Sequence, residues 1–224
     1  MQRFLDVAFS ILGIIIILPF FLPIVILLRM TGEGEIFFKQ TRIGFLGVPF
    51  KVFKFATMAK NSPNIGTGTI TVKNDPRVLP VGKILRKTKI NEFPQLLNIL
   101  KGDMSLIGPR PLTIEGYSGY SNKVIREIQK LRPGLSGVGS IVFRDEETIL
   151  QNFDDGVDGY IKFVAPFKAE LEVWYARNKN IKLYFALIFL TLMAIFVPKN
   201  KIFWKIFKNA PKPQGPLKDY FEIY

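Results

Sequence analysis

The sequence contains neither cysteine nor histidine among its 224 residues. Without cysteine there is no disulfide framework and no thiolate nucleophile, and without histidine there is no imidazole acid–base chemistry. The two absences together exclude zinc sites built from thiolate or imidazole ligands. Catalysis by this chain would have to use carboxylates, Lys, Arg, Tyr, Ser or Thr, or a metal held by oxygen. Oxygen ligands suit magnesium, the usual companion of substrate phosphates.

Acidic residues are scarce relative to basic ones. The 31 Lys and Arg against 18 Asp and Glu give a formal charge of +13. Such an excess favours anionic partners, among them phospholipid headgroups, nucleotides and nucleic acid. The chain carries no recognisable nucleic-acid-binding motif, and its Lys-rich stretches follow apolar segments, as membrane contacts would. We therefore expect membrane lipids and no nucleic acid among its partners.

A long stretch without charge lies close to the N-terminus. Val7 to Leu28 contains no charged residue and is bracketed by Asp6 and Arg29. A helix over this stretch is roughly 33 Å long, enough to cross the hydrocarbon core of a bilayer. Pro19 and Pro23 predict a kink or break in its middle. Hydropathy alone leaves two topologies open, a spanning helix and a helix that turns back to the face it entered.

Positive charge is heavy just after this segment and predicts that the catalytic part lies in the cytoplasm. A second apolar run, Leu183 to Val197, is short for a crossing and stops at Pro198. Lysines interleaved with aromatic residues follow it, which favours a helix in the headgroup layer, with a buried core helix as the alternative. The expected divisions are a membrane helix at 1–31, a cytosolic catalytic domain at 32–180, membrane-interface helices at 181–209 and a loose C-terminal tail at 210–224.

The middle of the chain predicts a mixed α and β domain with a small sheet. Residues 36–57 alternate apolar and polar side chains around a turn at Gly44 and Gly47, as two strands would. Residues 81–89 carry a helical pattern that is rich in Lys and Arg. In the helix that follows, Asn91 is expected to be the N-cap, Glu92 to suit the helix dipole, and the end to lie at Lys101-Gly102.

The tetrapeptide Gly-Pro-Arg-Pro at 108–111 has no evident role in a core. Pro109 and Pro111 restrict the backbone on both sides of Arg110. A guanidinium held in this way is preorganised to bind phosphate. The tetrapeptide taken alone is weak evidence, and its weight comes from the stretches around it.

These stretches together resemble the bacterial sugar transferase family, the small polyprenyl-phosphate phosphoglycosyl transferases with one membrane-associated catalytic domain. The matching pieces are RFLD with the apolar helix, GEIFFKQTRIG, FKVFKFATM, DPRVLPVGKILRKTKINEFPQLLNILKGDMSLIGPRPL, LRPGLSGVGSI and WYARN. The resemblance implies a monotopic α+β fold with surface amphipathic helices. It also implies that Pro19 breaks the anchor so that it is re-entrant, at the bacterial inner membrane with the catalytic domain facing the cytoplasm.

The resemblance further implies the reaction. A sugar 1-phosphate moves from a UDP-sugar to polyprenyl phosphate, UMP is released, and Mg²⁺ is required, as a first membrane step of surface glycan assembly. Arg86 is then expected near the lipid phosphate and Arg110 near the diphosphate. Further expected contacts are Lys54, Arg132 and Arg144, and Glu172 stands where the family often has an acid. The sugar, the polyprenol length, the later glycan and any homo-oligomer are left open.

One position departs from the family pattern. Asn91 precedes Glu92 where the family has Asp followed by Glu, and the family Asp forms an acyl-phosphate. An amide is a poor nucleophile, although its oxygen and that of Glu92 can still coordinate a metal. Three explanations stay open. Glu92 or the lipid phosphate attacks directly, the Asp was replaced to trap a substrate complex, or the chain is a catalytically silent relative that binds both substrates without turnover.

Overall fold

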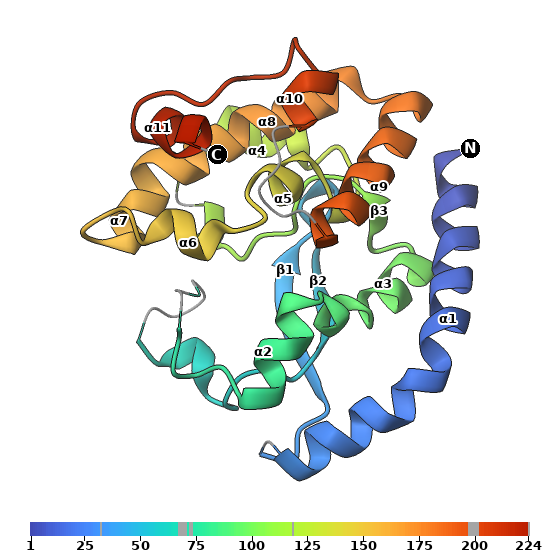
Figure 1. Ribbon diagram of the computed structural model, residues 1–224. Helices are drawn as coiled ribbons and strands as arrows, with labels where there is room; N and C mark the ends of the chain where they lie inside the picture. Colours follow the sequence, from blue (N-terminus) through green and yellow to red (C-terminus); the bar gives the residue numbers. More distant parts are fainter. Residues whose placement is uncertain (32, 67–70, 72–73, 118, 197–201, 224) are drawn as a thin grey trace.

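The computed structural model describes residues 1–31, 33–66, 71, 74–117, 119–196 and 202–223. It is a mixed α and β fold in which helices predominate. The four described strands are short and form two separate two-stranded sheets (Figure 1). In chain order its α-helices and strands are α1 (Gln2–Thr31), β1 (Phe37–Ile43), β2 (Pro49–Phe55), α2 (Pro80–Lys87), α3 (Gln95–Lys101), β3 (Ser105–Ile107), α4 (Asn122–Ile128), β4 (Gly134–Ser136), α5 (Val138–Val142), α6 (Glu146–Leu150), α7 (Gly156–Gly159), α8 (Ala165–Asn178), α9 (Ile181–Phe196), α10 (Ile202–Ile206) and α11 (Pro216–Ile223).

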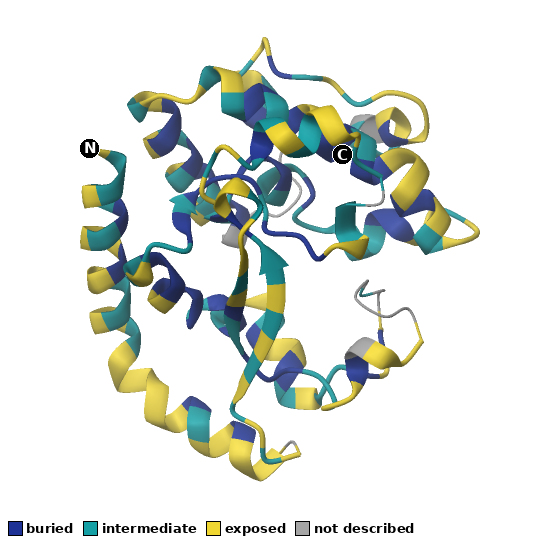
Figure 2. Ribbon diagram, turned by 180° about the vertical axis from the view of Figure 1, so that it is seen from behind, coloured by how far each residue is buried: buried dark blue, intermediate teal, exposed yellow. Residues whose placement is uncertain are grey.

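The helix α1 runs along one side of the molecule and bends midway (Figure 1). Pro19 and Pro23 lie inside it, where each removes a backbone donor, and this explains the bend. The helix continues through both prolines, so the predicted kink is present and the predicted break is not. Only 11% of its most apolar 18-residue stretch is buried (Figure 2), and by length and composition it is able to cross a membrane.

A buried carboxylate ties the first turns of α1 to the rest of the protein. Asp6 accepts hydrogen bonds from Ser105 Oγ at 2.8 Å, Leu106 N at 3.1 Å and Tyr184 OH at 2.9 Å. These donors belong to β3 and α9. Three donors on one carboxylate satisfy its buried oxygens, so the polar group anchors the helix without an unpaired charge. The hydrogen bonds thus join the apolar helix to the strand that precedes Arg110.

The strands β1 and β2 form the expected antiparallel hairpin, with Phe37 opposite Phe55 and Ile43 opposite Pro49. Its turn contains Gly47 at φ 78°, a left-handed conformation that favours glycine. The side chain of Asn98 on α3 completes the outer edge of β2. It accepts from Phe53 N at 3.0 Å and donates to Lys51 O at 2.8 Å. The hairpin is thereby held against α3.

Short parallel strands β3 and β4 bring two distant glycine-rich segments into backbone contact. A Cβ atom on Gly108 would lie 2.4 Å from Arg132 O, and one on Gly137 would lie 2.1 Å from Gly108 O. No side chain fits at these distances, so glycine is required where the two segments meet. This contact explains why the stretch around 108 and the stretch around 134 are both rich in glycine.

The largest core lies between α8, α9 and the C-terminal helices, and it corrects two predictions. Phe203 on α10 is only 1% exposed and packs edge-on to Trp174, with ring centroids 5.9 Å apart. This side of α10 is therefore core and not a headgroup contact. Residues 216–223 form the helix α11 with Leu217 buried, so the end of the chain is packed and not a loose tail. Pro198, Lys199 and Lys201 lie outside the described residues.

Candidate functional site

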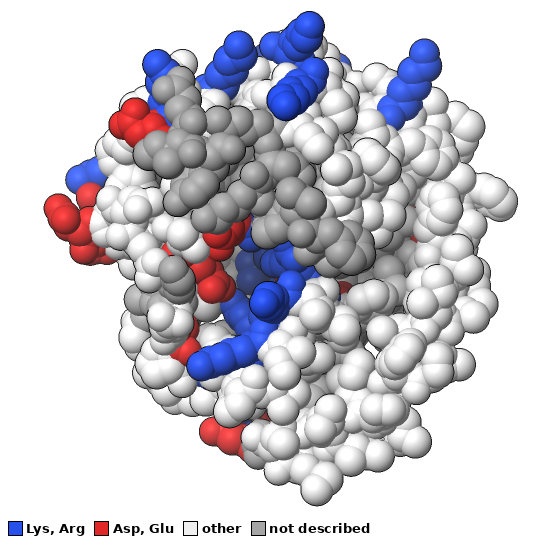
Figure 3. All heavy atoms as spheres, in the orientation of Figure 1, with Lys and Arg blue, Asp and Glu red and all other residues white. Residues whose placement is uncertain are grey.

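A cavity of about 1690 Å³ opens between the β1–β2 hairpin, α2, α9 and the turns around residues 110 and 144. In Figure 3 basic side chains gather in a hollow, with acidic side chains beside them. The polar lining includes Arg42, Lys54, Arg86, Lys89, Glu92, Arg110 and Arg144. Of the residues selected from the sequence, the structure brings Lys54, Arg86, Asn91, Glu92, Arg110 and Arg144 to this one cavity.

The Asn91-Glu92 pair lies on a short 3-10 helix, Ile90–Glu92, that faces the cavity. Asn91 is not an N-cap as predicted, because α3 begins only at Gln95, after the rigid turn at Pro94. Asn91 is 5% exposed, and its Oδ1 has no hydrogen-bond partner among the described atoms. A buried acceptor left in this state is costly and commonly marks a place for a ligand.

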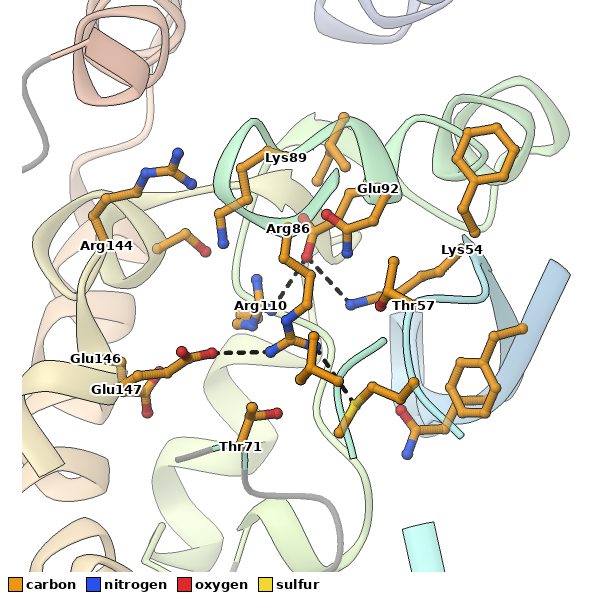
Figure 4. Close-up of a pocket in the computed structure, with 18 of the residues that line it drawn as sticks. Lys54, Thr57, Thr71, Arg86, Lys89, Glu92, Arg110, Arg144, Glu146 and Glu147 are labelled. Atoms are coloured by element: carbon orange, nitrogen blue, oxygen red, sulfur yellow. Dashed lines mark hydrogen bonds and ion pairs between the residues drawn. The ribbon is translucent and has the colours of Figure 1, made fainter. Parts of the chain in front are cut away.

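Glu92 is held between two cations from different segments. Its Oε1 lies 3.2 Å from Lys54 Nζ and 3.6 Å from Arg110 Nη2 (Figure 4). Burial raises the pKa of Glu92, but the charges of Lys54, Arg110 and Lys89 outweigh burial, and the pKa lies well below its usual value. Burial lowers the pKa of Lys54 to about 8 while Glu92 opposes that shift. Glu92 is therefore a carboxylate at neutral pH and cannot act there as an acid.

Arg110 is positioned by its backbone as well as by its prolines. Pro109 and Pro111 are both buried beside it, and the Arg110 N–H donates to Glu172 Oε1 at 3.5 Å. A Cβ on Gly139 would lie 2.6 Å from the same Glu172 oxygen, so this carboxyl needs a glycine to reach the loop. Glu172 thus braces the turn that carries Arg110 from inside the core.

The Glu172 carboxyl is expected to make stability depend on pH. Burial raises its pKa from 4.5 to about 7, although the backbone N–H of Arg110 and the charge of Lys168 lower it. Between pH 4.5 and about pH 7, Glu172 binds more protons in the folded state than in the unfolded state. The free energy of unfolding therefore falls as pH rises through this range. Glu172→Gln removes this slope and is expected to be more stable than wild type at about pH 8, by at most about 3 kcal/mol. Thermal unfolding in detergent at about pH 5 and 8 measures it, and equal slopes for both proteins would contradict it.

Of the other three arginines predicted as site residues, Arg86 and Arg144 line the cavity and Arg132 does not. Arg86 pairs with Glu147 across the cavity, Nη2 to Oε1 at 2.9 Å (Figure 4). Arg144 donates from Nε to Ala194 O at 3.3 Å and from Nη2 to Lys87 O at 3.2 Å. Arg132 is exposed, donates to Gly102 O at 2.9 Å and is not part of the cavity wall. The structure therefore does not place it with the other predicted phosphate contacts.

Several cations of the cavity wall were not identified as site residues from the sequence, and Arg42 and Lys89 are the two that interact with Glu92 or Arg110. Arg42 lies on the same face of the hairpin as Lys54, because residues two apart share a face and position 54 pairs with 38. Burial and then the charge of Arg110 lower the pKa of Arg42 to about 10. Strand alternation was thus a usable signal for Arg42. Lys89 had none, because its position depends on a left-handed turn at φ 61°.

A family model described as bacterial sugar transferase matches residues 1–198. The chain belongs to the bacterial sugar transferase family. The matched part contains α1, the hairpin, the Asn91-Glu92 turn and the loop of Arg110.

Relatives of this bacterial sugar transferase include proteins with names that state a reaction. It is 32% identical over 202 residues to the UDP-glucose:undecaprenyl-phosphate glucose-1-phosphate transferase of Escherichia coli K12, covering 89% of this chain and 41% of that protein. It is 30% identical over 196 residues to an N-acetylgalactosaminephosphotransferase of Aeromonas hydrophila, named as acting with UDP-N-acetylgalactosamine and undecaprenyl phosphate, with coverage of 87% and 43%. The chain thus spans less than half the length of both.

A third relative is similar along most of its own length. The uncharacterized sugar transferase EpsL of Bacillus subtilis 168 is 33% identical over 172 residues, covering 77% of this chain and 75% of that protein. These relatives bear the names of transferases, and they give no support to the alternative that this family member is a silent binding protein.

Proposed function

We propose that this chain transfers a sugar 1-phosphate from a UDP-sugar to polyprenyl phosphate and releases UMP. The observation that carries the proposal is the part of the cavity around Glu92, where its ionised carboxylate contacts Lys54 and Arg110 and where Arg42, Lys89 and Arg144 also line the wall. Such an excess of buried positive charge suits substrates that bring several phosphate charges, because arginine and lysine bind phosphate and offset its charge. The cavity also exceeds the roughly 300–1,000 Å³ typical of one small ligand, which leaves room for two substrates.

Magnesium fits this site by the chemistry of its donors. The buried Oδ1 of Asn91 lacks a partner among the described atoms, and Glu92 beside it supplies a carboxylate. Mg²⁺ is commonly held by one or two carboxylates together with substrate phosphates, so Glu92 and Asn91 would hold it. When bound, the ion offsets charge on the diphosphate. Among the described residues, no group of three or more Asp and Glu side chains is arranged so that it could hold a metal ion without further ligands.

The exposed apolar surface supports a proposal for how the protein lies at a membrane. The middle and the C-terminal part of α1 carry exposed apolar side chains. On α9, Phe185 and Phe189 are exposed apolar side chains as well. We propose that α1 enters the cytoplasmic face of the inner membrane and returns to it, with the bend at Pro19 making the return possible. The cavity would then open at the cytoplasmic surface, where both a lipid phosphate and a soluble nucleotide sugar can reach it.

The test is transfer of label from a panel of UDP-sugars to organic-soluble polyprenyl phosphate, with UMP release measured in parallel and Mg²⁺ present. We expect equal amounts of labelled lipid and UMP from at least one sugar. Removing Mg²⁺ with a chelator is expected to abolish both, and adding it back to restore them. Absence of transfer across the panel, from protein that still unfolds cooperatively, would contradict the proposal.

A further inference from the structure

Lys89 has a backbone conformation that needs a reason. It precedes the Ile90–Glu92 turn with φ 61°, and a left-handed conformation costs a residue other than glycine about 1 kcal/mol or more. Lys89 lines the cavity, as do Asn91 and Glu92, and Figure 4 shows its side chain on the same side of the cavity as Glu92. A strained backbone that directs a long cation into a cavity indicates a role for that cation.

The charge of Lys89 is not paired within the described part of the chain. Glu92 makes its ion pairs with Lys54 and Arg110, and Glu147 makes its ion pair with Arg86. The backbone of Lys89 donates to Arg86 O at 3.1 Å and accepts from Glu92 N at 3.0 Å, but its side chain makes no hydrogen bond or ion pair with another described residue. Arg144 is held by carbonyl oxygens of Ala194 and Lys87 and likewise has no described carboxylate partner.

Lys89 and Arg144 occupy one side of the cavity. Figure 4 shows both on the side of Glu92 opposite Lys54, and the charge of Arg144 contributes to the pKa shift of Lys89, as expected for near neighbours. The two cations come from separate elements, the turn after α2 and the turn before α6. They form a cationic pair that makes no ion pair with a described acidic side chain and feels the charge of Glu92 only at longer range, whereas Lys54 and Arg110 contact Glu92 directly.

The same side of the cavity adjoins the apolar helix α9. Ile188, Leu192 and Ala194 of α9 line the cavity, and the Ala194 carbonyl is the one that Arg144 contacts. Leu192 is also exposed on the outer surface of α9, together with Phe189. An anion that binds Lys89 and Arg144 therefore has apolar surface next to it, which suits a phosphate on a long hydrocarbon chain better than a soluble nucleotide.

We infer that Lys89 and Arg144 form a second anion subsite, which holds the phosphate of the lipid while Lys54 and Arg110 hold the diphosphate of the UDP-sugar. The inference rests on the proposed function and adds its order of events. With both bound, a lipid phosphate oxygen forms a bond to the β-phosphorus, the bond from that phosphorus to the bridging oxygen breaks, and the electron pair leaves with UMP. A phosphate monoester has a second pKa near 6, so the attacking dianion needs no base. Asn91 is then no obstacle, because no bond forms to the protein.

The first experiment compares wild type with Lys89→Gln and Lys89→Arg. Initial rates of wild type are measured while both substrate concentrations are varied. In double-reciprocal plots they are expected to give intersecting lines, which indicate that both substrates are bound before UMP leaves. Lys89→Gln is expected to raise KM for polyprenyl phosphate about tenfold to a hundredfold, the range for loss of one charged hydrogen bond, with KM for the UDP-sugar little changed. Lys89→Arg is expected to retain most of the affinity, and Lys130→Gln, an exposed lysine outside the cavity, to match wild type.

The second experiment looks for a bond to the protein. Wild type incubated with UDP-sugar and Mg²⁺ but without lipid is expected to show no added sugar-phosphate mass and no exchange of labelled UMP into UDP-sugar. The inference would be overturned by exchange of UMP or by a mass adduct on Lys89 or Glu92 in this second experiment. It would also be overturned by parallel double-reciprocal lines or by an unchanged KM for polyprenyl phosphate in Lys89→Gln in the first.

The inference can be separated from the proposed function by binding alone. A short-chain polyprenyl phosphate is titrated into wild type and Lys89→Gln by calorimetry in detergent, and the variant is expected to bind at least about tenfold more weakly. If no UDP-sugar is turned over but this difference is found, the proposed function fails and the subsite stands. Equal binding by both proteins would overturn the subsite even where transfer is observed.

Discussion

Glu92→Gln is expected to lower kcat for sugar-phosphate transfer by at least about a hundredfold, the lower range for loss of one preorganised electrostatic group in an active site. Glu92 contacts both Lys54 and Arg110, at 3.2 and 3.6 Å, and the amide cannot offset either charge. The two cations then repel each other in a buried place, and the geometry around the diphosphate is lost. UMP release at saturating substrates measures the effect.

The same substitution is expected to reduce stability. Removing one member of a buried ion pair costs about 3 kcal/mol, at the lower end of the usual range because the Arg110 side chain is a third exposed. Glu127→Gln is the matched control, since Glu127 pairs with Arg177 at 2.8 Å on the surface and outside the cavity. It is expected to cost less than about 1 kcal/mol and to leave turnover unchanged. Turnover by Glu92→Gln within tenfold of wild type would contradict the assignment.

Arg110→Lys is expected to lower kcat/KM for the UDP-sugar by about a hundred- to a thousandfold, or about 2.7–4 kcal/mol. The guanidinium is fixed by Pro109 and Pro111, and its planar group can bind two phosphate oxygens at once, whereas an ammonium acts as a point charge. The variant keeps the positive charge at position 110, so the loss of kcat/KM measures the contribution of the guanidinium geometry. Steady-state kinetics in the UDP-sugar, at saturating polyprenyl phosphate, give the value.

Arg132→Lys is the control for this prediction. Both arginines were expected to contact phosphate from the sequence, but Arg132 is exposed and outside the cavity wall. It is expected to keep kcat/KM within about threefold and to change stability little, because lysine keeps the charge and Arg132 contacts Gly102 O and the Phe45 ring only at the exposed surface. Equal losses from the two variants would mean that the cavity is not where the diphosphate binds.

Several local predictions were confirmed because short-range physics decides them. The hairpin around Gly44 and Gly47 follows from strand alternation and glycine turns, and α3 ends before the left-handed Gly102 as helices commonly do. The bend of α1 follows from proline geometry. The wrong predictions share another cause. Asn91 suited an N-cap by composition, but the turn at Lys89 and Pro94 places it in the cavity wall instead.

By itself the sequence determined the apolar N-terminal helix, the exclusion of thiolate and imidazole chemistry, the family motifs and four cations of the cavity, Lys54, Arg86, Arg110 and Arg144. These depend on residue type and on spacing along the chain. Only the tertiary structure decided that Arg42 and Lys89 join the site while Arg132 does not, that Phe203 and the last helix belong to the core, and that Glu172 braces the loop of Arg110. The reason is that burial and electrostatic contact depend on distances between segments far apart in the chain, which no local pattern records.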